Sequence, residues 1–519
     1  MKNHIKYLPL LALGFLSCEP EFDDAIEENE VYTAGEADFS NYVSLGNSLT
    51  AGFADNALYI QSQQNSYPNI IASQFALVGG GVFTQPLMAD NLGGLLLNGV
   101  QISNNRLVLS SNAGQPVIPP SSIAGTPQTE ITNKLSGPFN NMGVPGAKSF
   151  HLAAPGYGSV AGLELGQANP YFVRFSTSET TTILADAVAQ NPSFFSLWIG
   201  NNDILSYATS GGTGKDQVGN LDPSTYGSTD ITDPNVFGGV FTQLINELNA
   251  NASGGVVYNI PNVTDIPFFT TVPNNALVLD AASAGNLTGF FQAVAGIFTQ
   301  GLIQQGVPAA QAQALAAQYA IAFNEGPNRF LIDVPVTQTN PLGFRQMQVG
   351  ELLLLTINQG ALAQGYGSVA LSPAVLQVLG ILQQGGTPTQ EQAQLVLGAV
   401  NGIDDKDALD SDELTAIANA RSSYNSTIQS LAEANGLAFV DADALLNSVG
   451  QGLSFPGGII TSDFVTGGGF SLDGVHLTPR GYALIANETL RVINQTYGSN
   501  LPAVNIGEYG TITLSDNVN

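Results

Sequence analysis

The chain has 519 residues, of which 44% are hydrophobic and 10% are charged, and 41 acidic side chains against 13 basic ones give a net charge of −28. A chain of this length can bury a core without disulfide bonds, and its single cysteine excludes an intramolecular one. The negative charge repels phosphate backbones and anionic lipid headgroups, which argues against nucleic acid as a partner. The plainer consequence of this charge is solubility.

Residues 1–17 have the pattern of a secretory signal peptide. Lys2 and Lys6 precede an apolar run over residues 8–16, which is too short to span a bilayer, and a small residue stands before Cys18. The segment resembles a bacterial lipoprotein signal. That resemblance implies a mature chain that begins at Cys18 and carries a diacylglycerol on its sulfur. The alternative is an ordinary signal peptide with an incidental cysteine.

The acidic segment at residues 18–40 is expected to be a flexible tether. Acidic residues directly after a lipidated cysteine resemble the surface-export signal of Bacteroidetes lipoproteins. The implied location is the cell envelope, where the protein would be an outer-membrane lipoprotein held by its anchor. The sequence leaves open whether the anchor lies in the surface-exposed or the inward-facing leaflet. No later apolar run reaches the ~20 residues that a transmembrane helix needs.

Four short apolar runs are predicted to be strands, and ordered structure is expected to begin near Asn41. The runs cover residues 42–45, 194–199, 256–260 and 437–440. Each is bounded by residues that favour turns. Helical patterns lie between them, and alternating strands and helices indicate an α/β fold with a parallel sheet and helices on both faces. In such a sheet the chemistry gathers at the carboxyl ends of the strands.

Two helices near the end of the chain have clear start signals. Apolar residues at helical spacing predict a helix over residues 411–434, with Ser411 as its cap, directly before the fourth strand. A second helix is predicted over residues 482–494, with Thr478 as the cap and a proline at the first position. The polar segment 499–519 is expected to be a loosely packed tail.

Two segments interrupt the alternating pattern of the domain at residues 41–498. Residues from about 79 to 138 are rich in Gly, Asn, Ser and Pro and are predicted to form loops and a hairpin, with extended runs at 100–103 and 106–109. Residues from about 279 to 410 are rich in Ala and Gln and are predicted to be a mainly helical inserted subdomain or lid. The alternative is a decorated part of one domain.

The second insertion also contains segments of predicted secondary structure and an acidic stretch. Helical runs are expected at residues 308–323 and 373–383, and extended segments at 329–333 and 351–356. The acidic side chains of residues 404–413 lack the glycine of an EF-hand loop, so a solvated loop is favoured over a calcium site.

Histidine is scarce, which narrows the choice of a general base. The chain has three histidines, and His4 lies in the predicted signal, so the base is His151 or His476. His476 follows Asp473 by three residues with a glycine between them, and on a tight loop the carboxylate can hold the imidazole in one tautomer. The alternative is a plain loop before a helix. For His151 a packing role is favoured.

Ser48 lies in Gly-Asn-Ser-Leu-Thr-Ala-Gly, directly after the first predicted strand. A serine at a strand-to-helix turn is exposed at the carboxyl edge of the sheet, and its N–H near a helix N-terminus can donate to a developing oxyanion. The alternative is a simple helix cap.

Two further segments can supply oxyanion donors. Asn202, in Gly-Asn-Asn-Asp after the second strand, offers a neutral side-chain amide, although this is also an ordinary turn sequence. Gly146, in Asn-Met-Gly-Val-Pro-Gly-Ala-Lys, lies where a backbone N–H can point into a site, although the segment also suits a plain Gly/Pro loop.

In this order the four segments resemble the SGNH/GDSL hydrolase family. The resemblance implies a three-layer α/β/α flavodoxin-like core with a parallel sheet. It implies Ser48 as nucleophile, Asp473 and His476 as its partners, and an oxyanion hole of the Ser48 N–H, the Gly146 N–H and the Asn202 amide. It implies no metal or cofactor. One departure is Asn47, where the family has an aspartate before the nucleophile.

The activity implied by this resemblance is carboxylic ester hydrolysis, by an esterase or lipase that acts on a lipid or an acylated carbohydrate. Two alternatives stay open. One is a carbohydrate O-deacetylase that uses the same residues, and the other is a non-catalytic surface binding lipoprotein on this scaffold. The acyl chain, the alcohol and the oligomeric state are not set by the sequence.

Overall fold

The computed structural model describes residues 32–112, 115–116 and 119–512. The predicted signal, Cys18 and most of the tether therefore lie outside the described residues. No helix in the described part of the chain is both long and apolar enough to cross a membrane.

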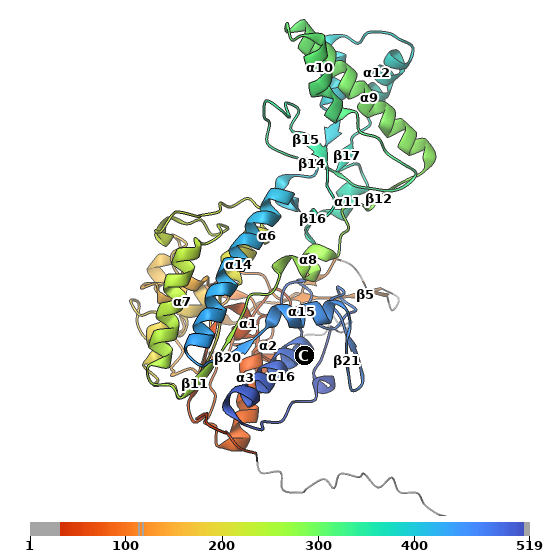
Figure 1. The fold of residues 1–519 in the computed structure, drawn as a ribbon. Helices are drawn as coiled ribbons and strands as arrows, with labels where there is room; N and C mark the ends of the chain where they lie inside the picture. Colours follow the sequence, from red (N-terminus) through yellow and green to blue (C-terminus); the bar gives the residue numbers. More distant parts are fainter. Residues whose placement is uncertain (1–31, 113–114, 117–118, 513–519) are drawn as a thin grey trace, which may run out of the picture.

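The described residues form a mixed α/β fold around a central sheet of five parallel strands, as the sequence predicted (Figure 1). Its order is β20-β11-β10-β1-β9. The bounds are Tyr42–Gly46 for β1, Asn141–Gly143 for β9, Phe194–Trp198 for β10, Gly254–Tyr258 for β11 and Ala438–Val440 for β20. Four of these are the predicted strands. The fifth, β9, corrects the expectation of a plain loop, because it pairs with β1 in register from Ser44 to Gly46.

Successive side chains of the strands point into two different helical layers, as the two-residue period of a strand requires. Val43, Leu45, Phe195, Leu197 and Val257 belong to one core cluster, with residues of α5 (Ile183–Val188), α7 (Pro234–Asn249) and α14 (Ser411–Ala434). Tyr42, Phe194, Val256 and Tyr258 belong to the other, with residues of α3 (Tyr67–Phe75) and α16 (Pro479–Tyr497). Helices therefore cover both faces of the sheet.

The two predicted helices near the end of the chain are confirmed as α14 and α16, with differences at their starts. Asp410 rather than Ser411 caps α14, because its carboxylate accepts the N–H groups of Asp412 and Glu413 while the Glu413 carboxylate accepts the Asp410 N–H. Thr478 caps α16 as predicted, but the helix starts at Pro479 and runs to Tyr497.

Both described chain ends pack on the layer of α3 and α16, in contrast to the predicted tether and loose tail. Phe39 is buried and stacks on Phe75 at 3.9 Å between ring centroids. Leu501 and Ile506 are buried in the same cluster. These isolated apolar side chains anchor segments whose overall polarity had indicated a flexible tether and a loosely packed tail.

The first interrupting segment is built of short ladders rather than one hairpin. The predicted runs at 100–103 and 106–109 do not pair with each other: β3 (Val100–Gln101) pairs with β2 (Leu95–Leu97), and β4 (Leu107–Val108) pairs with β7 (Ser121–Ser122). β3 therefore forms a tight hairpin with the strand before it, whereas β4 pairs at longer range with β7.

The second interrupting segment extends away from the sheet and has its own core (Figure 1). Its helices are α9 (Ala281–Gln304), α10 (Ala309–Ala316), α11 (Gln359–Leu362), α12 (Pro373–Gln383) and α13 (Gln390–Leu397). The prediction for α12 is confirmed and that for α10 is too long. The longest helix, α9, was missed because it contains four glycines, which have low helix propensity.

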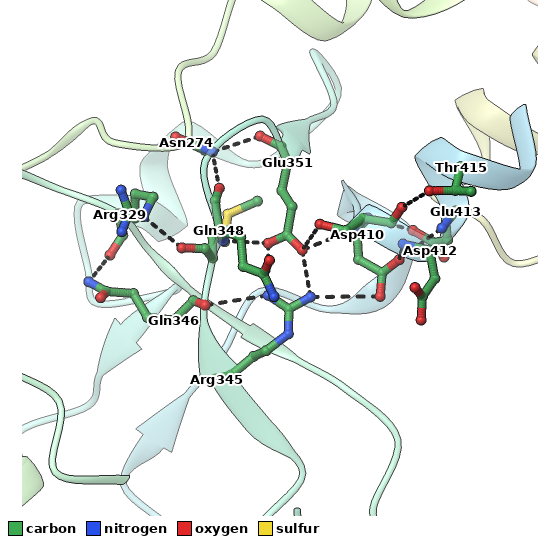
Figure 2. A network of polar contacts seen from close by, with 12 residues as sticks. Asn274, Arg329, Arg345, Gln346, Gln348, Glu351, Asp410, Asp412, Glu413 and Thr415 are labelled. Carbon is green, nitrogen blue, oxygen red and sulfur yellow. Dashed lines mark hydrogen bonds and ion pairs between the residues drawn. The ribbon is translucent and has the colours of Figure 1, made fainter. Parts of the chain in front are cut away.

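The base of this subdomain is joined to the start of α14 through Glu351, which also forms an ion pair with the partly exposed Arg345 (Figure 2). Arg345, on β15 (Phe344–Gln346), donates two hydrogen bonds to Glu351, at 2.6 and 2.8 Å. The Glu351 carboxylate is buried and also accepts the N–H and Oγ–H of Ser411. Next to it, β16 (Leu352–Leu353) pairs with β19 (Ala408–Leu409), so the predicted extended segment at 351–356 is a strand of two residues.

Candidate active site

Ser48 is the first residue of the short helix α1 (Ser48–Ala51), directly after β1. The turn between them is tight: a Cβ at Gly46 would lie 2.1 Å from the Thr50 Oγ1 and 2.4 Å from the Trp198 O, so glycine alone fits there. Asn47 caps the helix by accepting the Leu49 N–H at 3.0 Å. This turn places Ser48 at the carboxyl edge of the sheet.

Ser48, His476 and Asp473 form a continuous hydrogen-bonded chain. The Ser48 Oγ lies 2.8 Å from the His476 Nε2, and the His476 Nδ1 lies 2.8 Å from the Asp473 Oδ2. The ring of Phe53 lies 4.6 Å from the imidazole between centroids and covers it. The structure thus brings together the three residues that the sequence singled out from segments far apart in the chain.

The loop that carries Asp473 and His476 is folded around the carboxylate itself. The Asp473 Oδ1 accepts the N–H groups of Val475 and His476, while the Oδ2 accepts the Asn56 N–H at 2.9 Å. Gly474 allows this turn, because its φ of +70° is in the left-handed region. Asp473 is therefore held in place before any substrate is present.

The same contacts keep Asp473 ionised. Burial by itself would raise the pKa of this carboxyl. The neighbouring His476 and the hydrogen bonds to the carboxylate outweigh burial and hold the pKa of Asp473 well below its usual range. A carboxylate that stays charged can orient the imidazole and stabilise its protonated form.

The segments of Gly146 and Asn202 follow the strands on either side of β1. Strand order reverses between β1 and β10, and ligands of open parallel sheets bind at such a switch point. The Asn202 Nδ2 donates to the Ala147 O at 2.9 Å, which joins the two segments and leaves its second hydrogen uncommitted. Within the described chain, the N–H groups of Ser48 and Gly146 have no hydrogen-bond partner. Three donors of these segments are therefore uncommitted, and two of the residues that carry them, Ser48 and Asn202, line the same pocket.

Asn47 connects the nucleophile turn to the Asn202 segment. While its Oδ1 caps α1, its Nδ2 donates to the Asn201 Oδ1 at 3.3 Å, and both side chains are buried. An aspartate here would place a second acceptor opposite the Asn201 oxygen. The departure from the family pattern therefore keeps the capping contact and replaces a charge with a neutral donor.

His151 is not part of this site. Its Nδ1 accepts the Lys148 N–H at 3.0 Å, and its ring stacks on Tyr157 at 4.4 Å between centroids. Burial, helped by Lys148, lowers the pKa of His151 to about 3, so it stays neutral at neutral pH. These contacts agree with the packing role expected from the sequence.

The sequence did not predict two contacts that hold the site in place. Asp203 is buried and accepts the N–H and Oγ–H of Ser149, which fixes the segment that follows Gly146. The other contact links the inserted subdomain to the loop through Phe268, which precedes the insertion: the Phe268 N–H donates to the Gly474 O at 2.9 Å, and the Leu355 N–H donates to the Phe268 O at 2.8 Å. Asp203 lies in a motif already quoted, whereas no sequence signal indicated Phe268 or Leu355.

An apolar pocket opens from Ser48 and His476. It has about 840 Å³ of space between atoms, part of which is open to solvent. Its polar lining residues are Ser48, Asn201, Asn202 and His476, together with the Trp198 indole. The remaining lining residues are aliphatic, Phe470, a proline or glycines. Polar groups therefore gather at one end of an otherwise apolar space.

Comparison of the chain with protein-family models, with curated proteins and with solved structures gave no match. The function is accordingly argued from the geometry of the site.

Proposed function

We propose that this chain is a serine carboxylic ester hydrolase of the SGNH/GDSL type. The observation that carries the proposal is the hydrogen-bonded chain from Ser48 through His476 to Asp473, with distances of 2.8 Å at both steps. Geometry of this kind activates a serine as nucleophile on several unrelated folds. The uncommitted N–H groups of Ser48, Gly146 and the Asn202 amide would supply the second requirement of acyl transfer, an oxyanion hole.

In the proposed reaction, His476 takes the proton of Ser48 as the Oγ bonds to the ester carbonyl carbon. The oxyanion is held by the N–H groups of Ser48 and Gly146 and the Asn202 amide, each worth about 3 kcal/mol in the transition state. His476 then passes the proton to the departing alcohol oxygen. Water, deprotonated by His476, attacks the acyl-enzyme in the second half, which releases the carboxylic acid and restores Ser48.

The sheet supports the finer assignment of the fold. In chain order the five strands are β1, β9, β10, β11 and β20, so their spatial order reads 2-1-3-4-5. This is the order of flavodoxin-like doubly wound sheets. With helices on both faces, it fits the three-layer α/β/α core that the resemblance implies.

We also propose that Cys18 carries a lipid that anchors the enzyme in the cell envelope. The residues between Cys18 and Phe39, which packs on the core, would separate the enzyme from the membrane. Replacement of Cys18 by Ser should release the protein into the soluble fraction. A Cys18→Ser protein that stays in the membrane fraction to the same extent would contradict the anchor.

The activity is tested with p-nitrophenyl esters of several acyl lengths. Ser48→Ala should lower kcat/KM by about 10⁴-fold or more, because the nucleophile is lost. Ser66→Ala is a matched control: Ser66 is also buried, but its Oγ bonds Gln85 and takes no part in the site. Turnover of no ester, or turnover that survives in Ser48→Ala, would refute the proposed function and favour a binding protein on this scaffold.

A further inference from the structure

Much of the apolar pocket beside Ser48 is lined by elements that follow the last strand of the sheet. These are α15 (Ala442–Gly450), the hairpin of β21 (Leu453–Phe455) and β22 (Gly458–Ile460), and the first turns of α16. Its apolar lining residues from these elements are Ala442, Leu445, Leu446, Val449, Ile460, Leu484 and Ile485. Together they make a surface that no part of the described chain fills.

The local sequence aims these side chains at the pocket. Leu445 and Val449 are four residues apart and so share one face of α15, with Leu446 beside them. On β22, Ile460 is fully buried at the pocket, whereas its neighbour Ile459 is 65% exposed, as alternation along a strand requires. Leu445 and Leu446 are only half-buried, so the α15 side of the pocket has room for a ligand.

We infer that this pocket binds the acyl chain of the ester and makes the enzyme selective for medium-length or longer acyl groups. The inference rests on the proposed function, because it assigns the acyl chain to the group bonded to Ser48. The pocket begins at Ser48, His476 and Asn202, so a chain on the reacting carbonyl enters it directly.

The chemistry of the walls excludes other occupants of the same space. Sugar hydroxyls would lose their water and find almost no partners there, which is costly for each unpaired polar group. An acetyl group would place only a single methyl against these apolar walls. The alcohol part must leave after the first half of the reaction while the acyl part stays bonded to Ser48. A recessed apolar pocket at the nucleophile therefore suits the part that remains.

The expected selectivity follows from burial of methylene groups. Each methylene that enters the pocket should raise kcat/KM by about fourfold at most. The octanoate ester should therefore exceed the acetate ester by at least about tenfold. Methyl octanoate should likewise be preferred to octyl acetate, which carries the same chain on the alcohol side. Equal rates for acetate and octanoate, or a preference for octyl acetate, would overturn the inference.

The pocket itself is tested with Leu446→Trp, which adds bulk where there is room, and with Leu446→Gln, which keeps the size but adds polarity. Ile459→Trp is the matched control, because it places the same ring on the exposed side of β22. Both Leu446 variants should lower the octanoate-to-acetate ratio of kcat/KM at least tenfold. An unchanged octanoate-to-acetate ratio in both would overturn the assignment.

Binding without turnover separates this inference from the proposed function. In Ser48→Ala, calorimetry with methyl octanoate should detect binding that is at least tenfold weaker when Leu446→Gln is added. Binding in this background, with no turnover of any ester by the unmodified enzyme, would support the pocket and refute the hydrolase. Absence of binding, or binding unaffected by Leu446→Gln, would refute the pocket even if the enzyme hydrolyses esters.

Discussion

In the α/β core, five buried polar side chains gather at one edge of the sheet, whereas the described helices of the inserted subdomain of residues 279–410 bury only apolar side chains. Asn47, Ser48, Asn201, Asn202 and Asp203 are all buried at the carboxyl ends of β1 and β10. Among the described residues of the inserted subdomain, the buried polar side chains are Asn328, Glu351 and Ser368. None of them belongs to its helices, whose buried positions are apolar.

This difference indicates that the core carries the reacting groups and that the subdomain supports them. The core places donors, a base and a nucleophile around one point, while the subdomain presents no comparable group in its described helices. The subdomain nevertheless reaches the core at two places, the Arg345–Glu351 joint of Figure 2 and the contact of Leu355 and Phe268 with Gly474. We therefore expect core substitutions to affect the reaction strongly, and substitutions at the base of the subdomain to affect it through the loop of His476.

The largest effect predicted for the core is that of Asp473→Asn. The side chain keeps its size, but the loss of charge removes the partner that fixes the imidazole tautomer and stabilises its protonated form. The expected result is a fall in kcat of about 10⁴-fold with KM little changed, measured on an ester that the unmodified enzyme hydrolyses. A fall of less than tenfold in a folded variant would mean that another group orients His476.

The second effect tests the oxyanion hole. Asn202→Ala removes one donor and should lower kcat by about 10²- to 10³-fold, because that donor acts mainly in the transition state. Asn105→Ala is a useful comparison, since Asn105 is a similarly buried asparagine whose amide bonds two backbone carbonyls and Gln101 and does not line the pocket at Ser48. Rates for Asn202→Ala no lower than those for Asn105→Ala would remove this residue from the oxyanion hole.

The third effect belongs to the base of the subdomain. The Leu355 side chain packs on Gly474, with its Cδ2 2.9 Å from where a Cβ at that glycine would be. Leu355→Ala should lower kcat by about 10- to 100-fold without raising KM, because a small displacement of the loop misplaces His476. Leu376→Ala, on the half-exposed face of α12, should leave both constants unchanged. A rise in KM alone would show that Leu355 contacts substrate instead.

Much of the core could be predicted from sequence because its signals are local. Four strands are continuous apolar runs, and the candidate site residues lie in short segments directly after strands or before a helix. Strand β9 could not be found in this way, since its three residues become a strand only by pairing with β1. Helix α9 could not be predicted because its glycines have low helix propensity. Its stability comes from the packing of residues such as Phe290 and Phe291.

The contacts between the two regions were unpredictable for a different reason. Leu355 and Gly474 meet only after the insertion has folded and returned to the core, and neither residue type carries a chemical signal. The Arg345–Glu351 pair is likewise one of several possible ion pairs in the sequence. Charged residues indicate that partners exist but do not identify them.

The smallest effect predicted is a pH-dependent change in the free energy of unfolding, caused by Glu413 beside the Arg345–Glu351 pair. Burial raises the pKa of Glu413 to about 8 from its ordinary value of 4.5, and the nearby Asp410, Asp405 and Glu351 add to the increase. Between pH 4.5 and about 8, the Glu413 carboxyl therefore keeps a proton in the folded state that it has lost in the unfolded chain. The stability this provides is complete below pH 4.5 and is lost as the pH rises through about 8.

Glu413→Gln should remove this dependence, because the glutamine stays neutral and can still accept the Asp410 N–H. The thermal midpoint of the variant should exceed that of the unmodified protein at pH 9 by a few degrees, and the two should coincide near pH 4.5. Glu433→Gln, at the exposed end of α14, removes the same charge and should give no such pH-dependent difference. A difference of equal size at both pH values would mean that Glu413 affects the joint through packing rather than through its charge.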